Sequence, residues 1–259
     1  IVKVHVHTED PGLVMQEGLK YGSLVKVKVD NMRNQHEAQV EKEERSAKPA
    51  QEKEFAIIAV VAGEGLAEIF KAQGVDYIIS GGQTMNPSTE DFIKAVEQVN
   101  ARNIIILPNN KNIFMAAQSA AEVIEQPAAV IETRTIPQGL TSLLAFDGGK
   151  TIEENQERMT AALAEVVSGS VTTAVRDTTI DGLDGKIVVS NPDMLTALKE
   201  TFSKMLNEDS EIVSIYIGED GSEELASSLA QDLMEQFEDV EVEIHQGSQP
   251  VYPYIFSVE

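Results

Sequence analysis

Four short, uninterrupted apolar runs recur in the middle of the chain, and their spacing constrains the fold more than any other feature of the sequence. They cover residues 56–61, 77–79, 104–107 and 129–131. Runs without polar alternation are typical of strands that are buried on both faces, as in parallel sheets. The helical patterns between and after them run through Leu66, Ile69 and Phe70 and over residues 89–100 and 112–125. This order predicts a wound α/β lobe over residues 55–148.

The pattern changes after Gly149 and predicts a second lobe over residues 149–259. A helix is expected near residues 151–167, and Asp181–Gly182 indicates a turn. Further helices are expected over residues 193–206 and 222–237, and strands over 171–175, 186–189, 213–217, 240–244 and 254–258. Strands and helices in this order predict an α+β lobe of ordinary domain size.

The first 45 residues have the pattern of a strand, a helix and a second strand. Residues 1–7 alternate as a strand does, Pro11 precedes a short helical pattern, and residues 24–29 alternate again. Such a βαβ piece cannot bury a core by itself, so we expect it to complete a domain that lies mostly outside this sequence. Residues 46–54 lie in a stretch with charges of both signs and no aromatic residue, which predicts a linker.

Composition narrows the class of protein. The chain has 259 residues, of which 42% are hydrophobic, and this is enough to bury a core. It contains no cysteine, which excludes disulfide bonds and thiolate metal sites. The sequence has neither a signal-peptide pattern nor an apolar run approaching the roughly 18 residues that span a bilayer. These features predict a cytoplasmic protein without a transmembrane segment.

Negative charge is concentrated at the end of the chain. The formal net charge is −23, and no Lys or Arg follows Lys204, whereas 14 Asp or Glu residues do. Such a field repels phosphate backbones, so nucleic acid is not an expected partner. Two interpretations stay open: the acidic residues cover solvated helix faces and confer solubility, or they dock a basic protein surface.

Nucleotide-binding motifs are absent from the sequence. It has no P-loop, and Gly63-Glu64-Gly65 does not complete a dinucleotide fingerprint because Glu68 stands at the third glycine position. No nucleophile elbow and no zinc-protease helix motif occurs either. A self-contained nucleoside triphosphate site is therefore not expected.

His5 and His7 form the first candidate site. They lie two residues apart on an expected strand, so both imidazoles face the same side and are able to share a metal or position a phosphoryl group. A metal site needs three or four ligands, and the nearest further candidates in sequence are Glu9 and Asp10, beyond an expected strand end. A structural role for the pair is the alternative.

Two polar loops follow neighbouring strands of the expected parallel sheet and form the second candidate site. The residues are Gly81, Gly82, Gln83, Thr84 and Asn86 after the second strand, and Asn109 and Asn110 after the third. The carboxyl ends of parallel strands are where ligands bind in such sheets, and a carboxylate or phosphate is able to rest on the following helix N-terminus. A partner-binding or ligand-binding rim is one interpretation; a turn built for tight strand-to-helix packing is the other.

Several stretches together resemble one family. They are VKVHVHTEDPG, YGSLVKVKVDNMRNQH, AGEGLAEIF, DYIISGGQTMNPSTED, ILPNNKNIFMAAQ, TIPQGLTSLLAF, AVRDTTIDG and GSQPVYPYIFSVE. They resemble the ATP-binding subunit of the bacterial two-component fatty acid kinase, a dihydroxyacetone-kinase-like protein with an N-terminal DhaL domain. The resemblance covers nearly the whole chain. It departs from the family between Gly182 and Gly185, where the loop is shorter than in most members.

The resemblance implies a division of roles. Residues 1–45 would end a middle domain, and residues 55–259 would form a two-lobed, DegV-like domain. ATP and magnesium would bind a domain outside this sequence, so no cofactor is expected on this part. His5 and His7 match a histidine pair that the family uses with an upstream cysteine at a zinc-associated site needed for phosphotransfer, a site that is incomplete here.

The expected function follows from that resemblance. This part would dock a DegV-type fatty-acid-binding protein, whose acyl carboxylate ATP phosphorylates, and it would be inactive as a kinase alone. The resemblance also implies a role in phospholipid metabolism and a homodimer. The alternative is that the DegV-like lobes bind a fatty acid directly, with the carboxylate at residues 82–84 and the chain between the lobes.

Overall fold

The computed structural model describes residues 11–23, 52–81, 86–173, 179–183, 186–237 and 239–259. The chain divides into two units, Ile1–Ala47 and Lys48–Glu259. In the first unit the described residues contain helix α1, Pro11–Leu19, as the helical pattern after Pro11 predicts. The strands expected over residues 1–7 and 24–29, and with them His5 and His7, lie outside the described residues.

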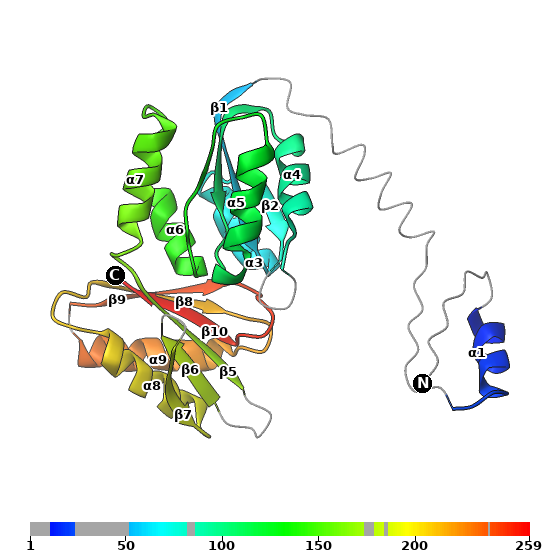
Figure 1. The fold of residues 1–259 in the computed structure, drawn as a ribbon. Helices are drawn as coiled ribbons and strands as arrows, with labels where there is room; N and C mark the ends of the chain where they lie inside the picture. The colour runs from blue at the N-terminus through cyan, green and yellow to red at the C-terminus, as the bar shows by residue number, and fades with distance from the viewer. Residues whose placement is uncertain (1–10, 24–51, 82–85, 174–178, 184–185, 238) are drawn as a thin grey trace. The chain divides into compact units, whose positions relative to one another are not determined.

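The first lobe of the second unit is built on a four-stranded parallel sheet, which confirms the predicted wound α/β class. Its order is β2-β1-β3-β4, with β1 Lys53–Val61, β2 Tyr77–Ser80, β3 Ala101–Leu107 and β4 Ala128–Val130. The helices are α3 Glu64–Ala72, α4 Thr89–Gln98, α5 Phe114–Val123 after the 3-10 turn Lys111–Ile113, α6 Ile136–Leu144 and α7 Ile152–Ala162 (Figure 1). We call this first lobe the parallel-sheet lobe.

Alternate side chains of the central strand explain why helices cover both faces of that sheet. Ile58 and Val60 pack in one cluster with residues of α4 and α5. Ile57 and Val61 pack in another cluster with residues of α3, α6 and α7. Because both faces are buried, the strand carries no polar residue from Phe55 to Val61.

Helix α6 was not expected from the sequence. Its segment contains Gly139 and several hydroxyl residues, which are weak helix formers. Its start is nevertheless specified, because Thr135 accepts a hydrogen bond from the backbone N–H of Gln138 and Pro137 stands in the first turn. The cap and the proline were the signals available in the sequence.

The second lobe contains a six-stranded sheet of order β7-β6-β5-β10-β8-β9, and we call it the six-stranded lobe. The strands are β5 Val167–Thr173, β6 Thr179–Leu183, β7 Lys186–Asn191, β8 Ile212–Ile217, β9 Glu241–Gln246 and β10 Tyr254–Val258. All neighbours are antiparallel except β8 and β9. Helices α8 Met194–Met205 and α9 Glu223–Gln236 lie on the same side of the sheet, below it in Figure 1. The lobe therefore combines strands and helices as predicted, but the helix expected near residues 151–167 is α7, which packs against the parallel-sheet lobe instead.

The turn expected at Asp181–Gly182 is wrong. Both residues lie within strand β6, and the pairing with β7 shifts register between them. Asp181 pairs with Val189 and Gly182 with Ile187, so the extra residue of this bulge is Val188 on β7, opposite the Asp-Gly pair. An Asp-Gly pair therefore marks a bulge here and not a turn.

Aromatic side chains fill the core between the six-stranded sheet and its helices. The rings of Phe202 from α8 and Phe256 from β10 lie 4.7 Å apart, and both side chains are 0% exposed. A Cβ at Gly169 of β5 would lie 2.1 Å from the ring of Phe256, so only glycine fits beneath that ring.

No helix in the described part of the chain is both long and apolar enough to cross a membrane.

We expect Phe202→Ala to lower the free energy of unfolding by about 3–5 kcal/mol, because it opens a cavity in a packed core. Leu144→Ala is the matched control: Leu144 is 69% exposed, and its replacement should change stability by less than about 0.5 kcal/mol. Urea denaturation followed by circular dichroism measures both. Equal effects of the two substitutions would contradict the described core.

Candidate functional site between the lobes

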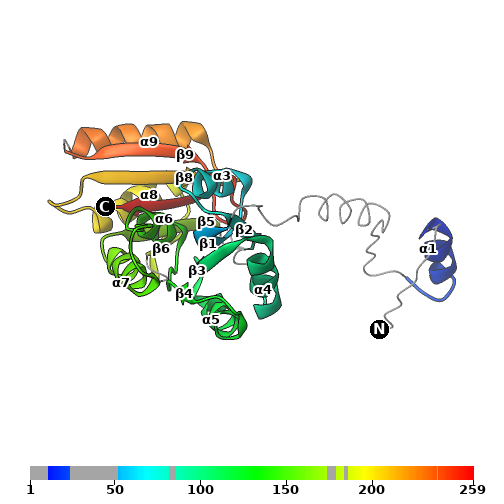
Figure 2. The same cartoon turned by 90° about the horizontal axis from the view of Figure 1, so that it is seen from above.

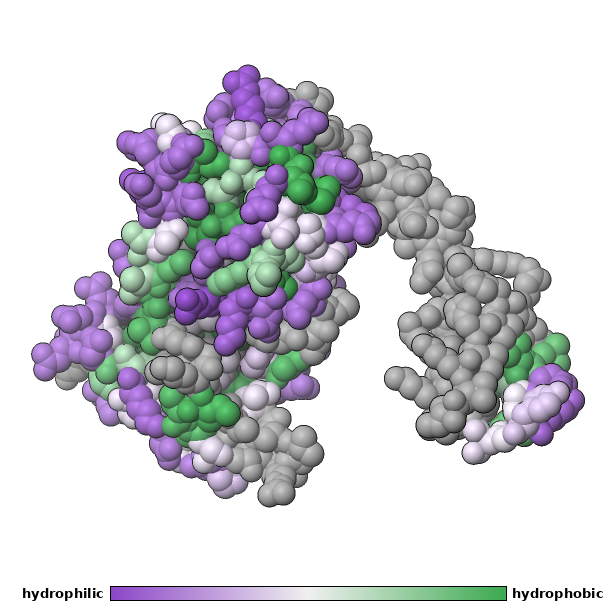
Figure 3. Space-filling view, viewed as in Figure 1, coloured by the Kyte–Doolittle hydropathy of each residue, from purple (hydrophilic) through white to green (hydrophobic). Residues whose placement is uncertain are grey.

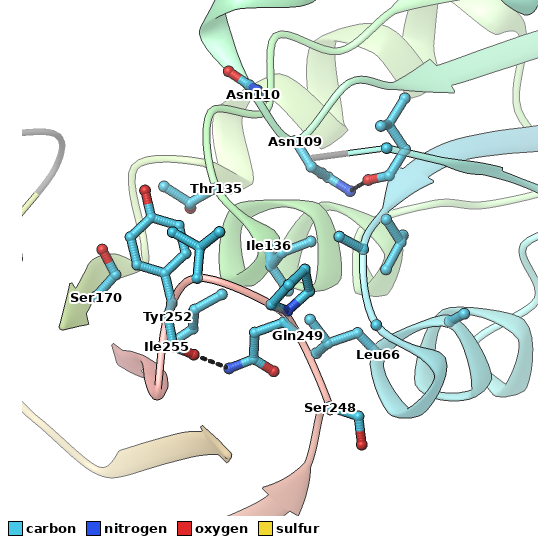
Figure 4. A pocket seen from close by; sticks show the side chains of 18 of the residues that line it. Leu66, Asn109, Asn110, Thr135, Ile136, Ser170, Ser248, Gln249, Tyr252 and Ile255 are labelled. Carbon is cyan, nitrogen blue, oxygen red and sulfur yellow. Dashed lines mark hydrogen bonds between the residues drawn. The ribbon is translucent and has the colours of Figure 1, made fainter. Parts of the chain in front are cut away.

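A cavity of about 520 Å³ lies where the parallel-sheet lobe faces the six-stranded lobe. From the first lobe it is lined by the carboxyl ends of β1 and β2, the loop after β3, and the starts of α3 and α6. From the second lobe it is lined by β5 and by residues 248–252, the loop before β10 (Figure 4). The carboxyl ends of parallel strands are thus one wall of the cavity, as the sequence predicted.

The structure places part of the predicted rim at this cavity. Gly81, Asn109 and Asn110 line it. The side-chain amide of Asn110 donates to Oδ1 of Asn86 at 3.4 Å, so the two predicted loops meet. Gly82, Gln83 and Thr84 lie outside the described residues. That the rim binds a partner or ligand stays a prediction.

Asn109 supports the fold of the rim. Its φ is 55°, a left-handed conformation that asparagine tolerates better than most residues. Its backbone N–H donates to Thr133 Oγ1 at 2.9 Å, and its Nδ2 donates to the carbonyl of Val60 at 3.1 Å. Its Oδ1 is buried and has no hydrogen-bond partner among the described residues, and a Cβ at Gly139 would lie 2.2 Å from it. Asn109 therefore ties β3 to β1 and packs closely against α6.

Two glycines let α3 approach the loop of the other lobe. The backbone N–H of Leu66 donates to the carbonyl of Gly247 at 2.9 Å. A Cβ at Gly65 would lie 1.9 Å from the carbonyl oxygen of Gln246, and one at Gly63 would lie 2.6 Å from that of Gly247. This contact, which only glycine permits, closes one end of the cavity.

Gln249 anchors the loop that forms the opposite wall. It is 2% exposed, and its Nε2 donates to the carbonyls of Tyr216 at 2.8 Å and Tyr252 at 3.3 Å. Ser248 and Val251 beside it have φ angles of 51° and 75°. Positive φ costs on the order of 1–3 kcal/mol for such residues and clusters at functional sites. Within the described residues, every non-glycine residue with positive φ lines this cavity.

The polar groups of the cavity come mostly from residues that the sequence analysis missed. Thr135 Oγ1 and Ser168 Oγ lie 2.8 Å apart and link the two lobes. Arg134 is the one Lys or Arg among the described lining residues, and it is exposed. Burial raises the pKa of Tyr252, which therefore keeps its proton and remains a hydrogen-bond donor. Thr135 and Tyr252 fall in two of the stretches that carry the family resemblance, TIPQGLTSLLAF and GSQPVYPYIFSVE, but no spacing indicates that these residues meet, because they do so only when the lobes are packed.

The cavity combines apolar walls with polar side chains. Its described lining includes the hydroxyls of Thr135, Ser168 and Ser170, the cation of Arg134 and the carboxylates of Glu64 and Glu219. The described residues contain no group of three or more His, Cys, Asp or Glu side chains able to hold a metal ion. Apolar walls with a few hydroxyls and one cation are typical of a site for an amphipathic ligand.

The two lobes and the cavity between them define a DegV-like fold, which confirms the prediction. A fatty-acid-binding protein of Thermotoga maritima superposes with a TM-score of 0.60 over 80% of this chain and 99% of its own, at 14% identity. The fatty acid kinase B3 protein of Streptococcus pneumoniae, solved with linoleic acid, superposes with a TM-score of 0.57 over 79% of this chain and 99% of its own, at 12% identity. At these identities the likeness shows the fold alone.

Family models identify the chain more closely. Residues 56–259 match the model for the C-terminal domain of FakA-like fatty acid kinase proteins, and residues 1–39 match the model for their middle domain. The chain belongs to this FakA-like fatty acid kinase family. An uncharacterized protein of Staphylococcus aureus strain USA300 is 50% identical over 100% of this chain and 50% of its own length. The chain thus spans about half the length of the curated relatives it matches.

We expect Gly63→Ala to destabilise the second unit more than Gly74→Ala does. Both glycines have positive φ, 101° and 95°, so alanine strains the backbone at each by on the order of 1–3 kcal/mol. At residue 63 the added Cβ also meets the loop backbone of the other lobe, whereas at residue 74 nothing lies within 4 Å. Thermal unfolding measures the difference. Identical melting temperatures for the two variants would show that the lobes do not meet at residue 63.

Proposed function

We propose that this chain is the part of a fatty acid kinase that docks the fatty-acid-carrying, DegV-type partner. Family membership supports the kinase system. The observation that carries the docking role is the negative charge of the segment after Lys204, which contains 14 Asp or Glu residues and no Lys or Arg. Twelve of the acidic residues after Lys204 are exposed: Glu208, Asp209, Glu211, Glu219, Asp220, Glu223, Glu224, Glu235, Asp239, Glu241, Glu243 and Glu259.

The charge has little internal compensation in the described residues. Asp232 pairs with Lys199 at 2.6 Å, and Glu243 lies 3.1 Å from His245. Across the described chain, no cationic side chain lies within 4.0 Å of the other eleven exposed carboxylates of this segment. Figure 3 shows hydrophilic residues over both lobes on the face in view. Such a field attracts a basic protein surface and speeds the encounter with it.

In the proposed mechanism the partner presents the carboxylate of its fatty acid. A carboxylate oxygen attacks the γ-phosphorus of ATP, the bond from that phosphorus to the β-phosphate oxygen breaks, and acyl phosphate and ADP result. ATP and magnesium are held by a domain outside this sequence. The present chain supplies position, and correct placement is worth about 7–11 kcal/mol of a reaction barrier. Docking alone would thus make this part of the protein necessary for a fast phosphoryl transfer.

Three finer predictions remain part of the proposal. The phosphotransfer role of His5 and His7, with the zinc that the resemblance associates with them, concerns residues outside the described part of the chain. The homodimer and the role in phospholipid metabolism likewise rest on the resemblance.

Calorimetric titration of the chain with a purified, lipid-loaded DegV-type carrier tests the docking role. We expect saturable binding that weakens between about 20 mM and about 150 mM salt, because ions screen exposed charges over a Debye length of about 8 Å at the higher concentration. The lipid-free carrier is the control for a contribution of the acyl chain. Absence of binding at both salt concentrations would refute docking.

Direct binding of a fatty acid is the second candidate function, and the cavity itself favours it. Its volume of about 520 Å³ falls within the usual range for small-molecule sites. Ile78, Ile136 and Ile255 offer apolar walls, and Arg134 offers a cation for a carboxylate. Glu64 and Glu219 also line the cavity and oppose an anionic head group.

If the cavity takes a fatty acid, Arg134→Gln should weaken palmitate binding by about tenfold, the typical effect of losing a charge-assisted hydrogen bond. Arg102→Gln is the control, because Arg102 is exposed and pairs with Glu52 at 2.8 Å, away from the cavity lining. Titration with fluorescent fatty acid measures both affinities. Stoichiometric palmitate binding without carrier binding would favour this candidate over docking.

A further inference from the structure

Strand β9 forms an open edge of the six-stranded sheet. It covers Glu241–Gln246 and pairs in parallel with β8 through six consecutive positions without a register shift. In the described part of the chain it has no second neighbouring strand. Figure 2 shows β9 as the last strand of the sheet, with β8 beside it. One side of β9 therefore has no paired strand in the described part of the chain.

The hydrogen bonds to β8 and its flanks show which backbone groups face that open side. The N–H of Glu241 donates to Glu211, and the N–H of Gly247 donates to Ile217, so both point toward β8. Backbone groups alternate along a strand, so the N–H groups of Val242, Ile244 and Gln246 point away from β8. These three donors, with the carbonyls between them, form a row that is available to another strand.

Most devices that protect sheet edges are missing here. Natural edges are blunted by short strands, proline, bulges or lysine. Strand β9 is six residues long and has none of these in its sequence EVEIHQ. Negative charge opposes unwanted pairing at this edge, since Glu241 and Glu243 are exposed on the same face. Ile244, on the opposite face, is 36% exposed.

Charge of one sign selects among strands that are able to pair. A second copy of β9 would bring glutamates of two chains together, and like charges opposite each other are destabilising. A strand with Lys or Arg at alternate positions would instead place its cations beside Glu241 and Glu243. His245 is the one residue after Lys204 able to become cationic, and it lies 3.1 Å from Glu243. The edge thus excludes acidic strands and admits basic ones.

We propose that β9 is the docking strand for a basic, extended segment of the protein partner, which adds to the six-stranded sheet as a seventh strand. Main-chain hydrogen bonds hold the segment, and Glu241 and Glu243 set its charge. This inference rests on the proposed docking function and assigns the edge of β9 as its binding surface.

Two variants separate the contribution of charge from that of main-chain hydrogen bonds. Glu241→Lys with Glu243→Lys reverses the charge while leaving exposed positions exposed. Ile244→Pro removes one of the N–H groups that point away from β8. An edge strand tolerates proline at such a position, because that N–H does not bond to a neighbouring strand. The control for the charge reversal is Glu97→Lys with Glu122→Lys, two exposed residues outside the six-stranded lobe. The control for the proline variant is Ala128→Pro in β4, an edge strand of the other sheet. Circular dichroism establishes that each variant is folded.

Calorimetry with the lipid-loaded DegV-type carrier at low salt measures the effect. We expect each β9 variant to raise the dissociation constant at least about tenfold, and each control to change it less than about threefold. Hydrogen exchange gives a reading that needs no variant: the amides of Val242 and Ile244 should slow in the complex, as those of a paired strand do.

The outcomes distinguish this inference from the function on which it rests. If the wild-type chain does not bind the carrier, docking and the role of β9 both fail. If it binds, but the β9 variants bind as the controls do and the two amides exchange unchanged, only the inference fails.

Discussion

The contact between α3 and the loop before β10 is the constraint on which the rest of the second unit depends. Leu66 donates to Gly247 across the two lobes, and Gly63 and Gly65 bring the backbones close enough for that bond. The contact joins the start of α3, which lines the cavity, to the loop that continues into the opposite wall. Because backbone atoms of both lobes make this contact, a Cβ added at Gly63 or Gly65 would collide with the loop.

The lobes meet through hydroxyl groups as much as through apolar surface. Ser168, Ser214 and Ser257 are buried on the sheet face opposite α8 and α9, and Thr141 Oγ1 donates to the Glu259 carboxylate at 2.7 Å. Tyr216 crosses into the apolar cluster of the parallel-sheet lobe, where burial raises its pKa to about 12. Polar interfaces of this kind are usual between domains that keep separate cores.

Local patterns were sufficient to predict most elements, because residues 56–61, 104–107 and 254–258 carry their own burial pattern. They also located Gly81, Asn109 and Asn110, since strand ends of a parallel sheet coincide. Local patterns failed where tertiary contacts decide. The apparent turn at Asp181–Gly182 is a bulge, and α6 is a helix of weak propensity that is held by its cap and by packing. Arg134 lies far in the sequence from the loop that carries Gln249 and Tyr252, so no spacing indicates that the three residues share a site.

Val251 has a consequence for how the family can be expected to change over evolutionary time. It is a β-branched residue at φ 75°, it is 42% exposed, and it lies at the mouth of the cavity. Glycine at this position would relieve the backbone strain and remove little buried surface. Selection for stability alone would therefore favour glycine at this position. A branched side chain that is retained there serves something other than stability, and its place in the cavity lining makes contact with a bound molecule the direct candidate.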